Sequence, residues 1–252
     1  CGGSRAEVVQ AVFTDVIEVD GDANALRIEH VHLAIEEAEA TAESADSAAP
    51  RADGDYSEYE ALLRSVESGA VAPLRGSWLL ELYEAGGRLR RRQELPPEAF
   101  WTLAELRAIV DAAKRHFGDD VEAGRAALGC LFNALSYRWL AKGQPDPDGF
   151  HLERVANFLY SYLGRGNPKY EDYDEHKATY MKCTPLNEQL FAPLGLPSPD
   201  CALFWDYGVL WQKALPDTDG VQEDDRTKEQ RAQMGEGLKS SNVWYGHAHA
   251  LT

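Results

Sequence analysis

The fold is decided by the stretch Cys201-Ala-Leu-Phe-Trp-Asp-Tyr-Gly-Val-Leu-Trp-Gln212. Its apolar run ends in an acid at Asp206, a pattern typical of a buried strand of an α/β sheet. An irregular stretch follows, and then Thr227-Lys-Glu-Gln230 forms a capping box. This box predicts a charged helix that runs to about Ser240.

A second apolar run, Leu128 to Tyr137, lies upstream and is long enough for a central strand. Between the two runs, Asp148 or Gly149 begins a predicted helix that Gly164 ends. The order is therefore strand, helix, strand, helix. Because a crossover of this length nearly always joins parallel strands, we predict that Leu131 to Tyr137 and Ala202 to Asp206 are parallel neighbours in one sheet. The predicted helix has one apolar face, made of Leu152, Val155, Leu159, Tyr162 and Leu163.

Composition divides the chain into three parts. Residues 1–55 are an acidic leader with a predicted hairpin over residues 8–35, then a linker or loose helix with disorder near residues 44–55. Residues 56–126 are a helical region, with capping boxes at Ser57-Glu-Tyr-Glu60 and Thr102-Leu-Ala-Glu105. Residues 127–252 are the α/β domain. Within it, residues 165–200 form a long insertion with at most one short helix, near Asn187 to Phe191.

The chain is strongly acidic, with a formal net charge of −17 over 252 residues. Residues 1–64 hold four Arg and no Lys against fifteen Asp and Glu, so this quarter carries −11 of that charge. Such a charge argues against nucleic acid as a partner, although a small anion could still bind a local basic site. The dense basic cluster is Arg88-Leu-Arg-Arg-Arg92. It is either a phosphate or acidic-peptide site, or it pairs with the acidic N-terminal quarter or faces solvent.

Cysteine, histidine and hydropathy patterns exclude several classes of protein. No run approaches the roughly 18 apolar residues that span a bilayer, and no signal peptide is present, so we expect a soluble cytoplasmic protein with no membrane partner. The four cysteines lie far apart, which favours reduced thiols, with Cys130 and Cys201 buried. The pairs His30-x-His32 and His247-x-His249 lack further ligands, so we predict no metal site. We interpret the sequence, which begins at Cys1, as a fragment.

Three motifs resemble those of the fungal heterokaryon-incompatibility (HET) domain. Ala134-Leu-Ser-Tyr-Arg-Trp139 resembles its opening "LSY-x-W" strand motif, and Phe204-Trp-Asp-Tyr-Gly-Val-Leu-Trp-Gln212 resembles its "W-x-D-x-x-x-x-x-Q" motif. Arg226 to Met234 is similar to its "E-R-x-x-Q-V-x-x-M" helix. Leu135-Ser-Tyr-Arg138 also looks like the first strand of Toll/interleukin-receptor (TIR) domains. The resemblance covers about residues 128–252 and implies a partial, flavodoxin-like parallel sheet behind the mainly helical region.

The resemblance has departures that bear on activity. Val209, Leu210 and Trp211 stand where the family has Cys-Ile-Asn, and Leu140 replaces a glycine. In catalytic TIR domains a glutamate that acts on the ribosyl carbon of NAD lies on a helix after the third strand, and no matching glutamate is visible here. Glu229 is the acid within the motifs that could substitute for it.

Polar side chains follow both predicted strands, where ligands collect in parallel α/β sheets. Ser136, Arg138 and Trp139 follow the first strand, and Asp206, Tyr207 and Gln212 follow the second. Arg138 suits a phosphate or carboxylate, Asp206 could accept from ribose hydroxyls or from Arg138, and Trp or Tyr could stack on a base. The alternative is that Asp206 caps a turn, Arg138 pairs with it, and the tryptophans fill the core.

Two functions follow from the resemblance. The first is an intracellular signalling or self-association module, because HET- and TIR-like domains commonly act by assembling. The alternative is an NAD-processing nucleosidase whose catalytic glutamate lies beyond the fragment. We predict no resident cofactor, with NAD considered as a ligand or substrate only.

Overall fold

A three-stranded sheet lies at the centre of the fold, with strand order β1-β3-β2. β2 (Phe132–Ala134) runs parallel to β3 (Ala202–Phe204), and its Phe132 lies opposite Ala202. β1 (Leu74–Arg75) runs antiparallel to β3 on the other side. The predicted parallel pairing of the two apolar runs is confirmed, and the chain is broadly of the α/β class.

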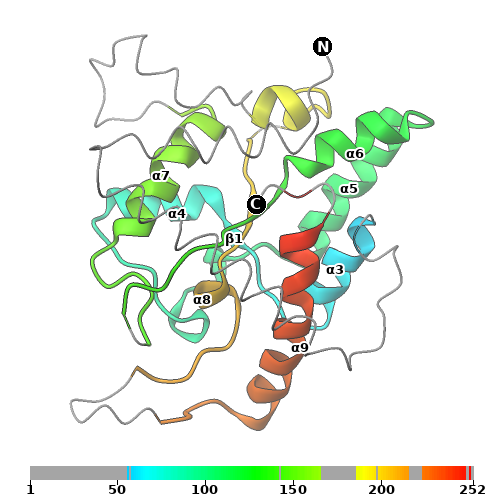
Figure 1. The fold of residues 1–252 in the computed structure, drawn as a ribbon. Helices are drawn as coiled ribbons and strands as arrows, with labels where there is room; N and C mark the ends of the chain where they lie inside the picture. Colours follow the sequence, from blue (N-terminus) through cyan, green and yellow to red (C-terminus); the bar gives the residue numbers. More distant parts are fainter. Residues whose placement is uncertain are drawn as a thin grey trace, which may run out of the picture. The chain divides into compact units, whose positions relative to one another are not determined.

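The computed structural model describes residue 56 and residues 58–141, 143–165, 186–196, 198–215, 223–247 and 250. All of them belong to one compact unit, Ala52–Thr252 (Figure 1). The predicted acidic leader, with its hairpin and linker, lies outside the described residues, as do His30, His32 and His249.

Both strands are shorter than the apolar runs that predict them. α6 (Val121–Gly129) includes Leu128, so β2 begins only at Phe132. Asp206 belongs to α8 (Asp206–Val209), a single helical turn, rather than to β3. The apolar runs therefore cover a strand and part of a neighbouring helix, because buried helix and buried strand have the same composition over so few residues.

The crossover helix is α7 (Phe150–Tyr162), and its predicted apolar face is buried. It packs against α4 (Gly76–Glu84). Gly149 precedes it with φ 78°, a left-handed conformation that favours glycine. The cap itself comes from Asp146, whose carboxylate accepts from the backbone N–H groups of His151 (3.0 Å) and Leu152 (2.9 Å). This carboxylate lies four residues before the helix, outside the spacing of an ordinary capping box.

The remaining helices surround the same core. α3 (Tyr59–Glu67) packs against both α5 (Leu103–Phe117) and α9 (Lys228–Gly246), and α5 packs against α6. In the view of Figure 1, α4 and α7 lie on one side of β1, and these helices lie on the other. Three short helical segments complete the described elements: η2 (Arg92–Glu94), η3 (Pro97–Ala99) and the π-helix η6 (Asn187–Phe191).

Helix boundaries agree with two of the three predicted capping boxes. Thr102 and Glu105 form a box at the start of α5, and Thr227 and Gln230 form one at the start of α9, which extends to Gly246. α3 instead has Glu58 as its N-cap, with no side-chain cap bond; Ser57 lies outside the described residues. The short helix predicted near Asn187 to Phe191 is also confirmed.

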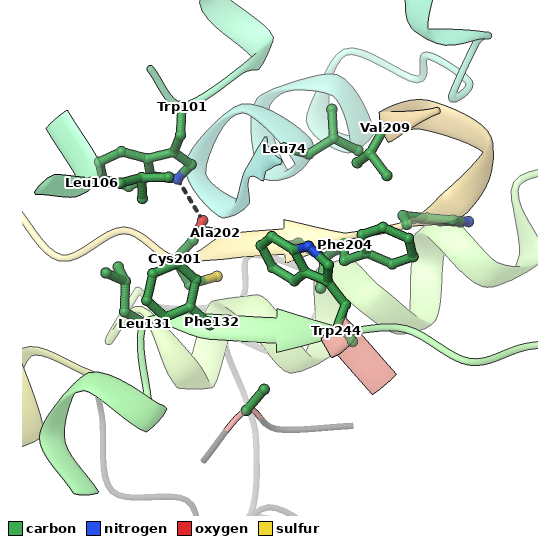
Figure 2. Close-up of a cluster of buried hydrophobic side chains, with 14 of the residues drawn as sticks. Leu74, Trp101, Leu106, Leu131, Phe132, Cys201, Ala202, Phe204, Val209 and Trp244 are labelled. Atoms are coloured by element: carbon green, nitrogen blue, oxygen red, sulfur yellow. Dashed lines mark hydrogen bonds between the residues drawn. The ribbon is translucent and has the colours of Figure 1, made fainter. Parts of the chain in front are cut away.

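Aromatic side chains fill the core around β2 and β3 (Figure 2). Trp244 of α9 stacks on Phe204 at 5.3 Å between ring centroids and meets Phe132 edge-on at 5.9 Å. The Trp101 indole N–H donates to the Cys201 carbonyl over 2.9 Å. Cys201 is a free, fully buried thiol whose pKa is raised by burial, as predicted for an inert core cysteine. Cys130 is also free but only partly buried.

Candidate functional site

The chain that leaves β2 alternates between two surroundings. Leu135 and Tyr137 are partly buried, whereas Ser136 and Arg138 are exposed. Successive side chains of an extended chain point in opposite directions, which explains the alternation. Tyr137 consequently faces the first residue of α8, and Arg138 faces away from it.

Asp206 is held by internal donors. The Tyr137 hydroxyl donates to its Oδ1 over 2.9 Å, and the Tyr207 backbone N–H donates to the same oxygen over 2.6 Å. Burial raises the pKa of Asp206, and hydrogen bonds from Tyr137, the Tyr207 backbone and Trp139 partly oppose the rise. Burial, followed by the charge of Asp206, raises the pKa of the Tyr137 hydroxyl. The carboxylate therefore serves as an acceptor within the fold.

Other predicted site residues join this cluster. The Gln212 side-chain amide donates to the Asp206 backbone carbonyl over 3.1 Å. The Tyr207 ring is almost fully buried, and this burial raises its pKa to about 12. Trp139 meets Tyr207 edge-on at 5.8 Å between ring centroids. The structure thus brings together Trp139, Asp206, Tyr207 and Gln212 of the six predicted ligand-binding residues, and directs Ser136 and Arg138 elsewhere.

The prediction that Arg138 contacts Asp206 is wrong. Among the described residues, Arg138 has no ion pair, and Tyr137 occupies the place beside the carboxylate. The error is a shift of one residue, which reverses the side-chain direction.

Sequence reasoning missed two residues of this edge. Tyr137 lies inside the LSY-x-W motif, and period-two alternation from the partly buried Leu135 could have identified it. His151 of α7 lies beside it, with ring centroids 4.9 Å apart, and its Nε2 is 3.0 Å from the Arg138 carbonyl oxygen. No local signal points to His151, because only the packing of α7 places it there.

A second carboxylate, Asp200, lies at the opposite end of β3. It accepts from the backbone N–H groups of Ser77 (2.8 Å) and Cys201 (2.9 Å) and from the Ser77 hydroxyl (2.8 Å). Ser77 is in the first turn of α4, so Asp200 satisfies that helix end. Burial raises its pKa, and these hydrogen bonds oppose the rise. This carboxylate is structural.

Two of the four arginines at residues 88–92 have partners inside the fold, and Arg88 and Arg90 are exposed. Arg91 binds both carboxylate oxygens of Asp225, at 2.9 and 3.0 Å, and Glu94 at 2.7 Å. Arg92 lies 4.2 Å over the Trp211 ring, and burial lowers its pKa to about 10. Intramolecular pairing is therefore confirmed for Arg91, but its partners are not in the acidic N-terminal quarter.

Glu229, the candidate catalytic acid, lies on the exposed first turn of α9. A backbone hydrogen bond lowers its pKa, as expected for an acid at a helix N-terminus. A carboxylate that attacks a ribosyl carbon works from a pocket that excludes water. The setting of Glu229 is that of a solvated helix cap.

Within the described part of the chain, no three His, Cys, Asp or Glu side chains are grouped so that they could hold a metal ion. None of the helices in that part combines the length and apolar content needed to cross a bilayer.

No protein-family model, curated protein or solved structure matches this chain.

Proposed function

We propose that this chain is a cytoplasmic protein-interaction module, of the signalling or self-association type suggested by its HET/TIR-like motifs. The supporting observation is the division of the candidate site into two parts. Asp206 accepts hydrogen bonds from internal donors, and Glu229 lies exposed in the first turn of α9. Cationic and apolar side chains instead point outward at the same edge, where a partner can reach them.

The outward group is defined here as the carboxyl-edge rim. It contains exposed residues from three neighbouring segments: Arg88, Arg138, Trp139, Leu140, Phe150 and Arg154. Large apolar side chains that share one exposed surface mark sites of interaction with a partner. Arg, Trp and Phe are also enriched in the energetically dominant parts of protein interfaces.

The alternative function, an NAD-processing nucleosidase, has one observation in its favour. Arg138 and Trp139 lie where a parallel sheet commonly binds a nucleotide, and they could contact a phosphate and a base. The reaction also needs a buried carboxylate that is free to act on the ribose. Among the candidate site residues, Asp206 already accepts hydrogen bonds and Glu229 is exposed.

Two measurements on the purified chain separate these functions. First, nicotinamide release from NAD should not exceed that of a buffer control. Release well above the control that Glu229→Gln abolishes would make the nucleosidase the leading function. Second, sedimentation velocity over a range of concentrations should reveal either a monomer or an oligomer that Arg138→Glu disperses. An oligomer that Arg138→Glu leaves intact would remove the rim from the interaction.

A further inference from the structure

We infer that the carboxyl-edge rim binds an acidic peptide segment that carries apolar or aromatic anchors. This inference rests on the proposed function and adds the chemistry of the partner. It follows from the continuity, the exposure and the charge of the rim.

The rim is one continuous surface. The Arg154 guanidinium lies 3.3 Å from the centre of the Phe150 ring. The adjoining His151 reaches the Arg138 carbonyl oxygen, and Trp139 and Leu140 follow Arg138 in the chain. On the other flank, the Arg88 guanidinium lies against Gly149, 3.0 Å from the position that a Cβ would take.

The apolar part of the rim is unusually open. Leu140 is 48% exposed, Phe150 45% and Trp139 38%, three of the six large hydrophobic residues that the described part of the chain leaves exposed. Trp139 and Phe150 are also held in place, by Tyr207 and Arg154 respectively. A preorganised aromatic side chain loses little conformational entropy when a partner covers it.

In the part of the chain that the structure describes, no carboxylate pairs with the arginines of the rim. Within the described residues, Arg88, Arg138 and Arg154 form no ion pair, and the side chains of Arg88 and Arg154 donate only to backbone carbonyls. By contrast, the same acidic chain pairs a carboxylate with each of Arg75, Arg91, Arg107, Arg125 and Arg226.

Two of the acids close to the rim are engaged inside the fold. Asp146 and Asp206 point inward and are bound by backbone or tyrosine donors. Asp148 is the exposed acid beside Phe150. Three arginines interleaved with apolar side chains are complementary to a segment in which Glu or Asp alternates with large apolar residues.

Two other occupants fit less well. Single-stranded nucleic acid binds in grooves whose positive charge follows the backbone, whereas the three arginines of the rim are separated by apolar side chains. A symmetric pair of copies would bring the three arginines of each rim into one interface, where like charges repel. The acidic, anchored peptide is the occupant that satisfies both the charge and the apolar surface.

Fluorescence anisotropy tests this inference with a short labelled peptide in which Glu alternates with Leu and Trp. We expect saturable binding that weakens as salt is added. Arg138→Glu and Phe150→Ala should each weaken it about tenfold or more. The matched controls are Arg115→Glu and Val121→Ala, a charge and a 53% exposed apolar residue remote from the rim in sequence, and they should leave binding unchanged.

Three results would overturn the inference: equal binding of the same peptide with Lys in place of Glu, tighter binding of a polyuridine oligonucleotide, or equal losses in the control variants. Absence of peptide binding by a chain whose oligomers Arg138→Glu disperses would defeat this inference but leave the proposed function standing. Glu229-dependent nicotinamide release would defeat the proposed function itself.

Discussion

The Asp206 cluster and the carboxyl-edge rim share one short stretch of chain but differ in what they can do. Tyr137 points into the fold and its hydroxyl donates a hydrogen bond to Asp206, whereas its neighbour Arg138 points into solvent. The polar groups of the Asp206 cluster form hydrogen bonds with one another, whereas the arginines and aromatic rings of the rim are exposed to solvent, where a partner can contact them. A motif can therefore contain both structural and functional residues, and burial separates them.

Removal of the Asp206 carboxylate should have the largest effect on stability. Asp206→Ala should lower the free energy of unfolding by about 1 to 3 kcal/mol, because the buried Tyr137 hydroxyl loses its acceptor. Chemical denaturation measures the loss. Asp148→Ala, which removes an exposed acid near the rim, is the control and should cost less than about 0.5 kcal/mol. Equal effects of the two changes would show that Asp206 is not held as described.

Tyr137→Phe tests the hydrogen bond to Asp206 alone, because it removes a single hydroxyl. It should cost about 0.5 to 1.5 kcal/mol, the usual net value of one hydrogen bond. Tyr160 provides a matched control, since its hydroxyl donates over 2.8 Å to the exposed Glu84 carboxylate. Tyr160→Phe should cost less, because water can replace the tyrosine at an exposed acceptor. A larger cost for Tyr160→Phe would contradict the assignment.

The pH dependence of stability tests the burial of Asp206. Burial raises its folded-state pKa above the unfolded value of about 3.9, so the folded chain binds more protons than the unfolded chain just above that pH. This group's contribution to stability therefore falls as the pH rises through the window between the two pKa values. Wild type should lose stability relative to Asp206→Asn between about pH 4 and its folded pKa. Asp200 is present in both proteins, so its contribution cancels. A gain in the stability of wild type relative to Asp206→Asn over this range would be the opposite result.

Rim substitutions should have the smallest effect on folding. Arg138→Ala is expected to change the free energy of unfolding by less than about 0.5 kcal/mol. Combined with Asp206→Ala, it should be additive, because the two side chains do not touch. Thermal melts of the single and double variants measure this. A clear non-additive term would restore the direct contact between Arg138 and Asp206 that the structure replaces with Tyr137.

Sequence reasoning found the elements whose signals are local. The parallel pairing of β2 with β3 followed from two apolar runs joined by an amphipathic helix, and the caps at Thr102 and Thr227 followed from spacing alone. It could not place Asp200 as the cap of α4, because tertiary packing supplies that contact. Asp146 caps α7 from outside the usual N-cap position, which the capping-box spacing does not describe.

The same limit applies to the candidate site. Residue types and order identified Trp139, Asp206, Tyr207 and Gln212 as neighbours of the sheet edge, since side chains after parallel strands meet there. The partner of Asp206 depended on the direction of one side chain, which a one-residue shift reverses. The rim also depended on Phe150 and Arg154, which lie on the predicted helix but outside the apolar face that the sequence identified.

One paired measurement tests whether the Asp206 cluster supports the fold while the carboxyl-edge rim binds a partner. The melting temperature and the affinity for the acidic peptide should be measured on the same samples of Asp206→Ala and Arg138→Glu. We predict opposite patterns for the two variants. Asp206→Ala should melt at a lower temperature but bind the peptide nearly as wild type does, when binding is measured at a temperature where the variant is folded. Arg138→Glu should melt like wild type and lose binding. Loss of both properties in both variants, or binding lost only in Asp206→Ala, would contradict it.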